Sequence, residues 1–187
     1  MIEDRRNRKT TAIIEKIFIE LLSKKSIDKI SVTEICEKAD INRGTFYLHY
    51  TDINNLSESI QDKILSNAEN ILTYNIENKN NDNSDFIVPI LENLKENKSF
   101  LLSLGMNSNI DNFTKKFSKI IHKMMIKSND NFKLKIDNYF LEYFTSYFSG
   151  AASGIIANWL RNECKDETKK IADLILNLTL NGINYYK

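Results

Sequence analysis

Apolar residues recur along this chain every three to four positions, the spacing that places side chains on one face of an α-helix. The first such stripe predicts a helix over 10–23, which the polar segment SKKSIDK ends; it consists of Ile14, Ile17, Phe18 and Leu21. Further stripes predict helices over 32–39, 43–50, 52–75, 86–96, 98–105, 110–127, 134–162 and 167–185. The asparagine-rich segment 75–85 is predicted to be a loop. No segment alternates apolar and polar residues long enough to favour a strand, so the predicted fold class is all-α.

Two short helices with a tight turn between them are predicted around residue 40. Ser31 precedes the first helix, and Glu34, three positions later, completes the capping-box pattern of a helix start. Asp40 tolerates the left-handed backbone of a turn, and Asn42 is a favourable N-cap for the second helix. Two helices joined by three or four residues form a helix-turn-helix, so the sequence predicts this motif over residues 31–50.

The second helix of this motif opens with residues that suit recognition of bases in the major groove. Arg43 presents two donors that match guanine O6 and N7, and Gly44 lets the backbone approach the groove. Thr45 can donate to a phosphate or contact a thymine methyl, whereas Tyr47 and His49 can reach phosphates on either side. The sequence therefore predicts that this helix reads DNA.

Residues around the helix complete the predicted interface. Phe46 and Tyr50 are spaced i, i+4 and are expected to point inward, while the start of the preceding helix can meet a phosphate. Three of the five arginines lie in the first eight residues; they form either a phosphate-binding basic arm or a solvated, frayed terminus. The formal net charge of +1 does not by itself indicate a nucleic-acid protein. The predicted DNA-binding residues are Arg5, Arg6, Arg8, Ser31, Thr33, Asn42, Arg43, Gly44, Thr45, Tyr47, Leu48 and His49.

The run SVTEICEKADINRGTFYLHYTDINNL resembles the DNA-binding domain of the TetR/AcrR family of regulators, with a close match over residues ~10–60. The family pattern T-V-x-x-I-A-x-x-A-G-V-S-x-G-T-x-Y-x-H-F is represented by Ser31, Val32, Ile35, Cys36, Ala39, Asp40, Ile41, Asn42, Gly44, Thr45, Tyr47, His49 and Tyr50. The resemblance implies a DNA-binding domain at 1–52 and a helical ligand-binding and dimerisation domain at 53–187. It also implies that two dimer-related reading helices enter successive major grooves of a palindromic operator.

Three positions depart from the family pattern. Ile53 stands where the family often has a lysine, which removes a phosphate contact. Asp40 replaces the usual turn glycine and adds negative charge near DNA, and Cys36 replaces a common alanine. The missing lysine, the Asp40 charge and the near-zero net charge also fit an alternative function: a coactivator of the same fold that acts mainly through a protein partner, with weak or no DNA binding. A small-molecule-binding protein that has lost DNA function is a third option.

The last two predicted helices resemble the family's dimerisation helices. The segment GAASG at 150–154 has almost no side-chain bulk, so helix axes can approach closely there. An apolar stripe on the following helix would extend this surface. The predicted dimer interface consists of Gly150, Gly154, Ile171, Leu174, Ile175 and Leu178.

Aromatic residues are concentrated in the same region, where members of this family often enclose an inducer. Aromatic side chains at helical spacing also serve simply as core packing. Because few charges lie among these positions, a pocket here would favour a small apolar or aromatic ligand. The predicted pocket residues are Phe100, Phe113, Phe117, Tyr143, Phe144, Tyr147 and Trp159.

Other classes of protein find little support in the sequence. Residues 139–160 are rather apolar, but their serines, threonine, asparagine and tyrosines favour a buried soluble helix over a membrane span. Cys36 and Cys164 are distant and His122 is isolated, so we expect no metal site, no cofactor and a reducing, cytoplasmic location. No nucleotide-binding or hydrolase motif is present, so no enzyme activity is expected. The sequence predicts a homodimeric, DNA-binding transcription regulator, usually a ligand-responsive repressor in this family.

Overall fold

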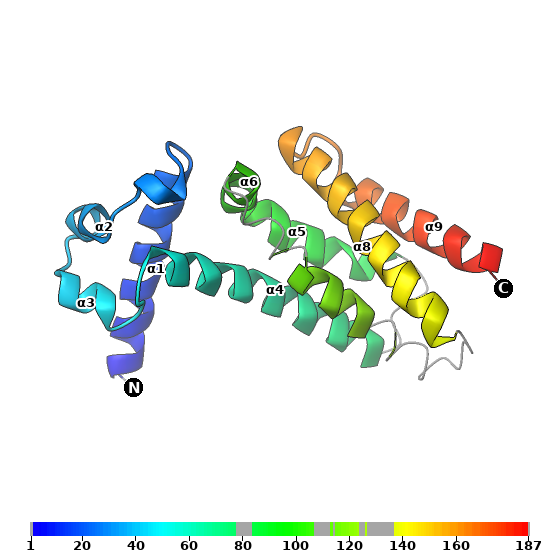
Figure 1. Ribbon diagram of the computed structural model, residues 1–187, viewed down its shortest axis with the longest axis horizontal. Coiled ribbons are helices and arrows are strands. Elements are labelled where there is room, and N and C mark those ends of the chain that lie inside the picture. Colours follow the sequence, from blue (N-terminus) through cyan, green and yellow to red (C-terminus); the bar gives the residue numbers. More distant parts are fainter. Residues whose placement is uncertain are drawn as a thin grey trace. The chain divides into compact units, whose positions relative to one another are not determined.

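Helices account for the regular structure in the described part of the chain (Figure 1). The structure is a computed structural model that describes residues 2–77, 84–106, 113, 115–123, 126 and 137–186. None of these residues lies in a strand, which confirms the predicted all-α fold. The named elements are α1 (Ile2–Leu22), η1 (Ile27–Lys29), α2 (Val32–Ala39), α3 (Arg43–Tyr47), α4 (Ile53–Glu77), η2 (Ser84–Phe86), α5 (Val88–Glu96), α6 (Lys98–Met106), α8 (Asn138–Arg161) and α9 (Thr168–Tyr186).

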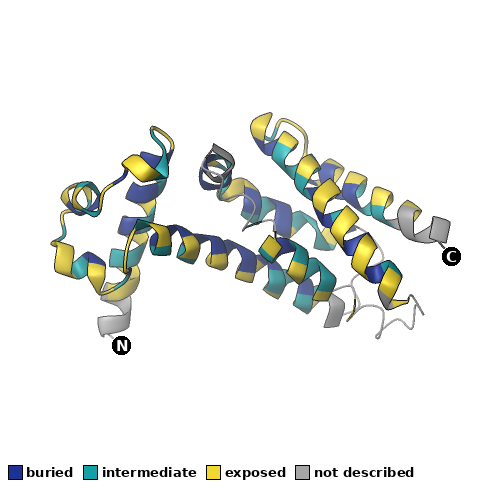
Figure 2. Cartoon of the chain, in the orientation of Figure 1, coloured by how far each residue is buried: buried dark blue, intermediate teal, exposed yellow. Residues whose placement is uncertain are grey.

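The chain divides into two compact units. One unit comprises Met1–Lys63 and Ser99–Asn109, and the other comprises Ile64–Lys98 and Ile110–Lys187. Helix α4 therefore contributes its first part to one unit and its remainder to the other. In both units the buried residues follow one side of each helix, as Figure 2 shows.

The first unit is built on the apolar faces of α1, α2, α3, the start of α4 and α6. The rings of Phe18 and Phe100 lie 6.5 Å apart in its core. Burying each large apolar side chain contributes ~1.5–3 kcal/mol, which holds the short helices α2 and α3 in place where their own length would not. Its fully buried large apolar residues are Ile14, Phe18, Ile35, Phe46, Leu56 and Phe100.

The second unit contains the rest of α4, α5, the helical residues 115–123, α8 and α9. The turn from α8 to α9 is tight, because Glu163 and Cys164 both take positive φ angles of 59° and 52°. The Cys164 amide bonds the carbonyl of Trp159 at 3.0 Å, and the Trp159 indole donates to the Asp166 carbonyl at 2.9 Å. These bonds close the turn and set α9 beside α8 (Figure 1).

Several predicted boundaries are wrong, each for a local reason. Helix α1 begins at Ile2 rather than residue 10, so the first arginines belong to this helix. Helix α3 ends at Tyr47 rather than residue 50, because the amide of His49 bonds the carbonyl of Phe46 in a tighter turn.

Both ends of the segment 75–85, which was predicted to be a loop, are helical. Helix α4 continues to Glu77, and residues 84–86 form η2, while residues 78–83 lie outside the described part.

Helix α8 starts at Asn138, where the Asp137 carboxylate accepts a 2.7 Å hydrogen bond from the Phe140 amide. The predicted helical residues 134–136 lie outside the described part.

Candidate nucleic-acid interface

The turn between α2 and α3 is fixed by a cap at each side. Ser31 Oγ accepts a hydrogen bond from the Glu34 amide at 3.2 Å, which confirms the predicted start of α2. The Glu34 carboxylate bonds Lys25 at 2.5 Å. At the other end of α2, Asp40 takes the left-handed conformation (φ 52°, ψ 48°), and the Ile41 amide bonds the Cys36 carbonyl at 3.0 Å. Asp40 therefore supplies the helix stop that glycine usually provides.

Helix α3 is launched by Asn42. Its side-chain oxygen accepts from the Thr45 amide at 2.8 Å and from the Thr45 hydroxyl at 3.0 Å. Because the Thr45 hydroxyl proton is used in this cap, its methyl group and its oxygen lone pairs are what remain for a partner. A Cβ at Gly44 would lie 3.2 Å from the same Asn42 oxygen, so glycine gives the cap room.

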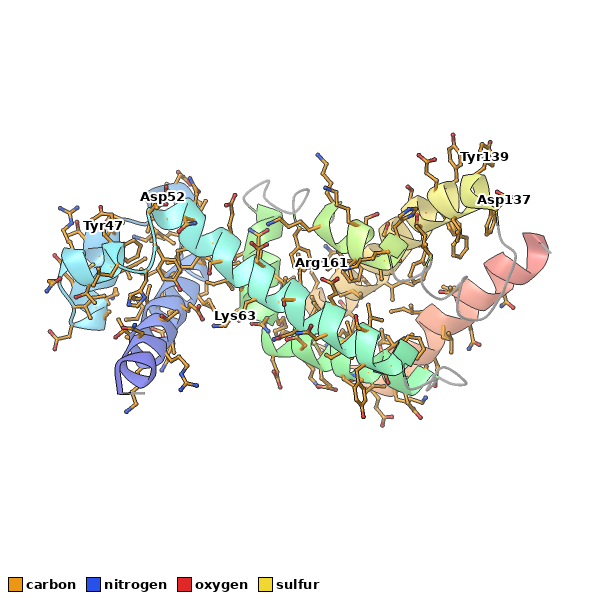
Figure 3. All side chains as sticks on the ribbon, turned by 90° about the horizontal axis from the view of Figure 1, so that it is seen from below. Tyr47, Asp52, Lys63, Asp137, Tyr139 and Arg161 are labelled. Atoms are coloured by element: carbon orange, nitrogen blue, oxygen red, sulfur yellow. The ribbon has the colours of Figure 1, made fainter. Side chains whose placement is uncertain are left out.

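The outer side of α3 is open to solvent. Arg43 is exposed, Tyr47 is 53% exposed and Leu48, at the end of the helix, is 83% exposed. Phe46 and Tyr50 point inward as predicted, with exposures of 0% and 5%. Figure 3 places Tyr47 on α3, outside the core of its unit. The accessible edge of α3 thus presents the cation of Arg43, the backbone of Gly44 and the phenol of Tyr47.

The N-terminal end of α2 lies beside this edge. Ser31 and Thr33 are exposed there, and Thr33 lines a shallow hollow together with Asn42 and Arg43. The same hollow is lined by Glu37 and Asp40, so two carboxylates border the arginine. The interface therefore combines donors for phosphate with negative charge at the turn.

The remaining predicted residues differ in how the structure places them. Arg8 is exposed on α1, whereas the side chains of Arg5 and Arg6 lie outside the described part. His49 is half-buried, with its ring 6.3 Å from that of Tyr50. Cys36 is buried, and burial raises the pKa of its thiol, which fits a small residue at a position where the family commonly has alanine.

One functional candidate was not predicted from the sequence. The carboxylate of Glu15, on α1, accepts hydrogen bonds from Tyr50, just after α3, and from Lys63 on α4. Glu15 lies 35 residues from Tyr50 and 48 from Lys63 in the sequence, so no local pattern could have indicated these contacts.

The predicted pocket residues do not gather around one cavity among the described residues. Phe100 packs against Phe18 in the first unit, and Trp159 is used in the α8–α9 turn. Phe144 and Tyr147 line a groove of about 30 Å³, well below the ~300–1,000 Å³ of typical ligand pockets. Phe117 is buried, Phe113 is half-buried and Tyr143 is 63% exposed.

The predicted dimer residues separate into two groups. Ile171 and Ile175 are 7% and 5% exposed and belong to the core of their own unit. Gly150 and Gly154 are exposed, and a Cβ on either would meet no described atom within 4 Å. Leu174 and Leu178 on α9 are 45% and 55% exposed, which leaves an apolar surface on α8 and α9.

Three tyrosines extend this surface along α8. Tyr139, Tyr143 and Tyr147 are spaced i, i+4 and are more than half exposed. Figure 3 shows Tyr139 projecting from the start of the helix, beside Asp137. Tyr143 and Tyr147 were predicted to line a pocket, but an aromatic stripe has the same spacing on an exposed surface.

The described helices are too short or too polar to cross a membrane. Together, the all-helical architecture and the exposed helix-turn-helix are typical of a transcriptional regulator. A family model for a TetR-type transcriptional regulator C-terminal region matches residues 81–181. The chain therefore belongs to the TetR/AcrR family of transcriptional regulators.

Known proteins show the same likeness. The chain is 37% identical over 73 residues to the HTH-type transcriptional regulator YvdT of Bacillus subtilis (strain 168), a match covering 37% of this chain and 34% of YvdT. The match thus spans about a third of that relative's length. Two solved structures share the fold over nearly the whole chain.

The first is the dihydroxyacetone kinase operon activator DhaS, with a TM-score of 0.66 at 22% identity, covering 94% of this chain and 97% of that one. The second is FadR from Bacillus subtilis in complex with stearoyl-CoA, with a TM-score of 0.68 at 12% identity, covering 91% and 98%. At these identities the likeness concerns the fold.

Proposed function

We propose that this regulator is a homodimer that binds a palindromic DNA operator through α3 and releases it when a small ligand binds, acting as a cytoplasmic repressor. Residues 1–52 read DNA, and residues 53–187 bind the ligand and dimerise. The observation that carries the proposal is the outward-facing α3, which exposes Arg43 and Tyr47 while Phe46 anchors the helix inside. Arg43 reads guanine, and Tyr47 contacts phosphate.

A dimer is supported by the exposed apolar surface of α8 and α9. Gly150 and Gly154 allow close approach of a second helix, and Leu174 and Leu178 supply apolar area that water would otherwise contact. Two-fold pairing places two reading helices in successive major grooves, which is why the operator is expected to be palindromic.

The ligand is proposed to be apolar or aromatic. Phe117 and Phe144 are buried in the second unit, and the FadR structure of similar fold holds stearoyl-CoA. A ligand releases DNA only if it binds the DNA-incompetent state more tightly, by a few kcal/mol. Uncharged aromatic and aliphatic compounds, such as naphthalene and a long-chain alcohol, are the first probes for thermal stabilisation and for operator release, and the anionic stearoyl-CoA is the contrasting probe.

The direct experiment selects bound duplexes from a random pool with the wild-type protein and measures binding of Arg43→Ala and Tyr47→Ala to the selected duplex. Each substitution is expected to weaken binding strongly while leaving the thermal unfolding midpoint close to that of the wild type. Asn70→Ala, at an exposed position of α4, is the matched control. Wild-type binding by both interface variants would overturn the assignment of α3.

A second candidate is a coactivator that works through a protein partner. Glu37 and Asp40 border Arg43 with negative charge, Ile53 stands in place of a lysine, and the similar structure of DhaS is that of an operon activator. Salt dependence separates the two candidates. A DNA reader loses affinity steeply with salt, in proportion to the phosphates it contacts, whereas a partner-binding coactivator shows no comparable DNA binding.

A further inference from the structure

Three hydrogen bonds converge on the carboxylate of Glu15 in the middle of α1. Oε1 accepts from the Tyr50 hydroxyl at 3.1 Å and from Lys63 Nζ at 3.1 Å, and Oε2 accepts from the same Nζ at 2.9 Å. The Glu15 side chain is only 15% exposed, whereas that of Lys63 is 58% exposed. The carboxylate therefore joins three segments: α1, the turn that follows α3, and α4.

Tyr50, which donates one of these hydrogen bonds, is buried. The side chain is 5% exposed, and burial, together with the negative charge of Glu15, raises the pKa of its phenol. The hydroxyl therefore remains protonated and keeps its donor role at any physiological pH. Through Glu15, Tyr50 is linked to α1 and, by way of Lys63, to α4.

From Tyr50 the contacts continue into the reading helix. The Tyr50 and Phe46 rings have centroids 5.8 Å apart, and the edge of one ring meets the face of the other between Phe46 and Tyr47, at 5.6 Å. Phe46 is fully buried, so its position determines how α3 is rotated about its axis. That rotation decides whether Arg43 and Tyr47 face the groove.

The geometry points to Glu15 as a positioning residue for DNA recognition, one that fixes the orientation of α3 against α1 and α4. This inference rests on the proposed DNA-reading role of α3. Because Lys63 lies on α4, the same carboxylate also connects α3 to the helix that continues into the second unit. Loss of the Glu15–Tyr50 bond should loosen the orientation of α3 while its phosphate contacts survive.

Specific and non-specific binding should therefore respond differently. Base contacts need the correct rotation of α3, whereas attraction to the phosphates depends on charge and tolerates misorientation. A residue that merely stabilised the fold would instead lower the unfolding midpoint and leave the preference for the operator unchanged in the folded molecule. The ratio of the two affinities distinguishes these roles.

The test compares Tyr50→Phe and Glu15→Gln with Glu20→Gln, which removes the same charge from an exposed position on α1. Affinities for the selected operator and for a scrambled duplex are measured well below the unfolding midpoint and at several salt concentrations. Tyr50→Phe changes no charge, so it isolates the hydrogen bond. Glu20→Gln corrects for any general gain in DNA affinity from a lost carboxylate.

Tyr50→Phe and Glu15→Gln are expected to lower the operator-to-scrambled ratio about tenfold to a hundredfold, the loss of one hydrogen bond to a charged group. The double variant should be no worse than the worse single one, and Glu20→Gln should keep the wild-type ratio. Wild-type ratios in Tyr50→Phe and Glu15→Gln would overturn the inference but leave the proposed function standing. A wild-type protein that does not prefer the operator would overturn both.

Discussion

Asn42 and Thr45 share two hydrogen bonds, since the Asn42 side-chain oxygen accepts from both the amide (2.8 Å) and the hydroxyl (3.0 Å) of Thr45. This double cap opens a helix of five residues, too short to be stable from its own backbone bonds. The cap and the buried Phe46 are therefore the local features that shape the reading helix.

Removing the cap should destabilise the protein measurably. Asn42→Ala is expected to cost about 1 kcal/mol of unfolding free energy, the usual loss for an N-cap replaced by alanine. Asn42→Asp keeps an acceptor oxygen and is expected to retain most of that stability. Urea unfolding followed by circular dichroism measures both, and equal midpoints for Asn42→Ala and the wild type would show that the cap contributes nothing.

Two buried polar atoms on α4 predict a gain in stability. Ser57 Oγ and Gln61 Oε1 are almost fully buried and have no hydrogen-bond partner among the described residues. An unsatisfied buried polar group costs ~1–3 kcal/mol, so Ser57→Ala and Gln61→Met should each raise the unfolding free energy. Glu58→Ala, at an exposed position between them, is the control. A loss of stability in Ser57→Ala and Gln61→Met would indicate that these atoms are satisfied in solution.

The loss of the protein's stability at acidic pH should depend on Asp173. Its carboxylate is held by the hydroxyl of Ser84 and by Lys169, and both lower its pKa below the ordinary 3.8. A carboxyl whose pKa is lowered in the folded state contributes its full stabilisation at pH values above 3.8, its ordinary pKa. That contribution is lost as the pH falls from 3.8 through the lowered pKa of the folded state.

Asp173→Asn is therefore expected to reduce the difference in stability between neutral pH and pH near 3, measured by thermal unfolding across that range. Glu142→Gln, at an exposed position on α8, removes the same charge and should leave the wild-type pH profile. An unchanged profile in Asp173→Asn would contradict the role of the Ser84–Asp173 contact.

The exposed surface of α8 and α9 predicts the effect of a charge on assembly. Leu178 is 55% exposed and lines a groove with Tyr147, so Leu178→Glu should shift the protein from dimer to monomer in sedimentation velocity. Asn177→Glu introduces the same charge at the neighbouring exposed position and is expected to leave more of the protein dimeric than Leu178→Glu does. A dimer that is unaffected by Leu178→Glu would place the interface elsewhere.

The parts of the site that were predicted from sequence are those with local signals. Ser31 and Asn42 were predicted as caps from side-chain chemistry, and each accepts a hydrogen bond from the amide three residues later. The inward positions Phe46 and Tyr50 follow from helical spacing alone.

What the sequence could not predict depends on contacts between distant segments. Glu15 looks like one of many surface carboxylates until α1 and α4 are brought together around Tyr50. Phe100 was assigned to a ligand pocket, but its packing against Phe18 depends on where α6 lies. The same spacing of aromatic residues in the sequence occurs in a core, in a pocket wall and on an open surface.

The central claim is that two copies of α3 enter successive major grooves of an operator. Hydroxyl-radical footprinting of the wild-type protein on the selected duplex tests it most directly. The account predicts two protected segments related by two-fold symmetry, with centres about 10 base pairs or a multiple of that apart, and their loss in Arg43→Ala. Continuous protection without symmetry, or an unchanged footprint in Arg43→Ala, would contradict it.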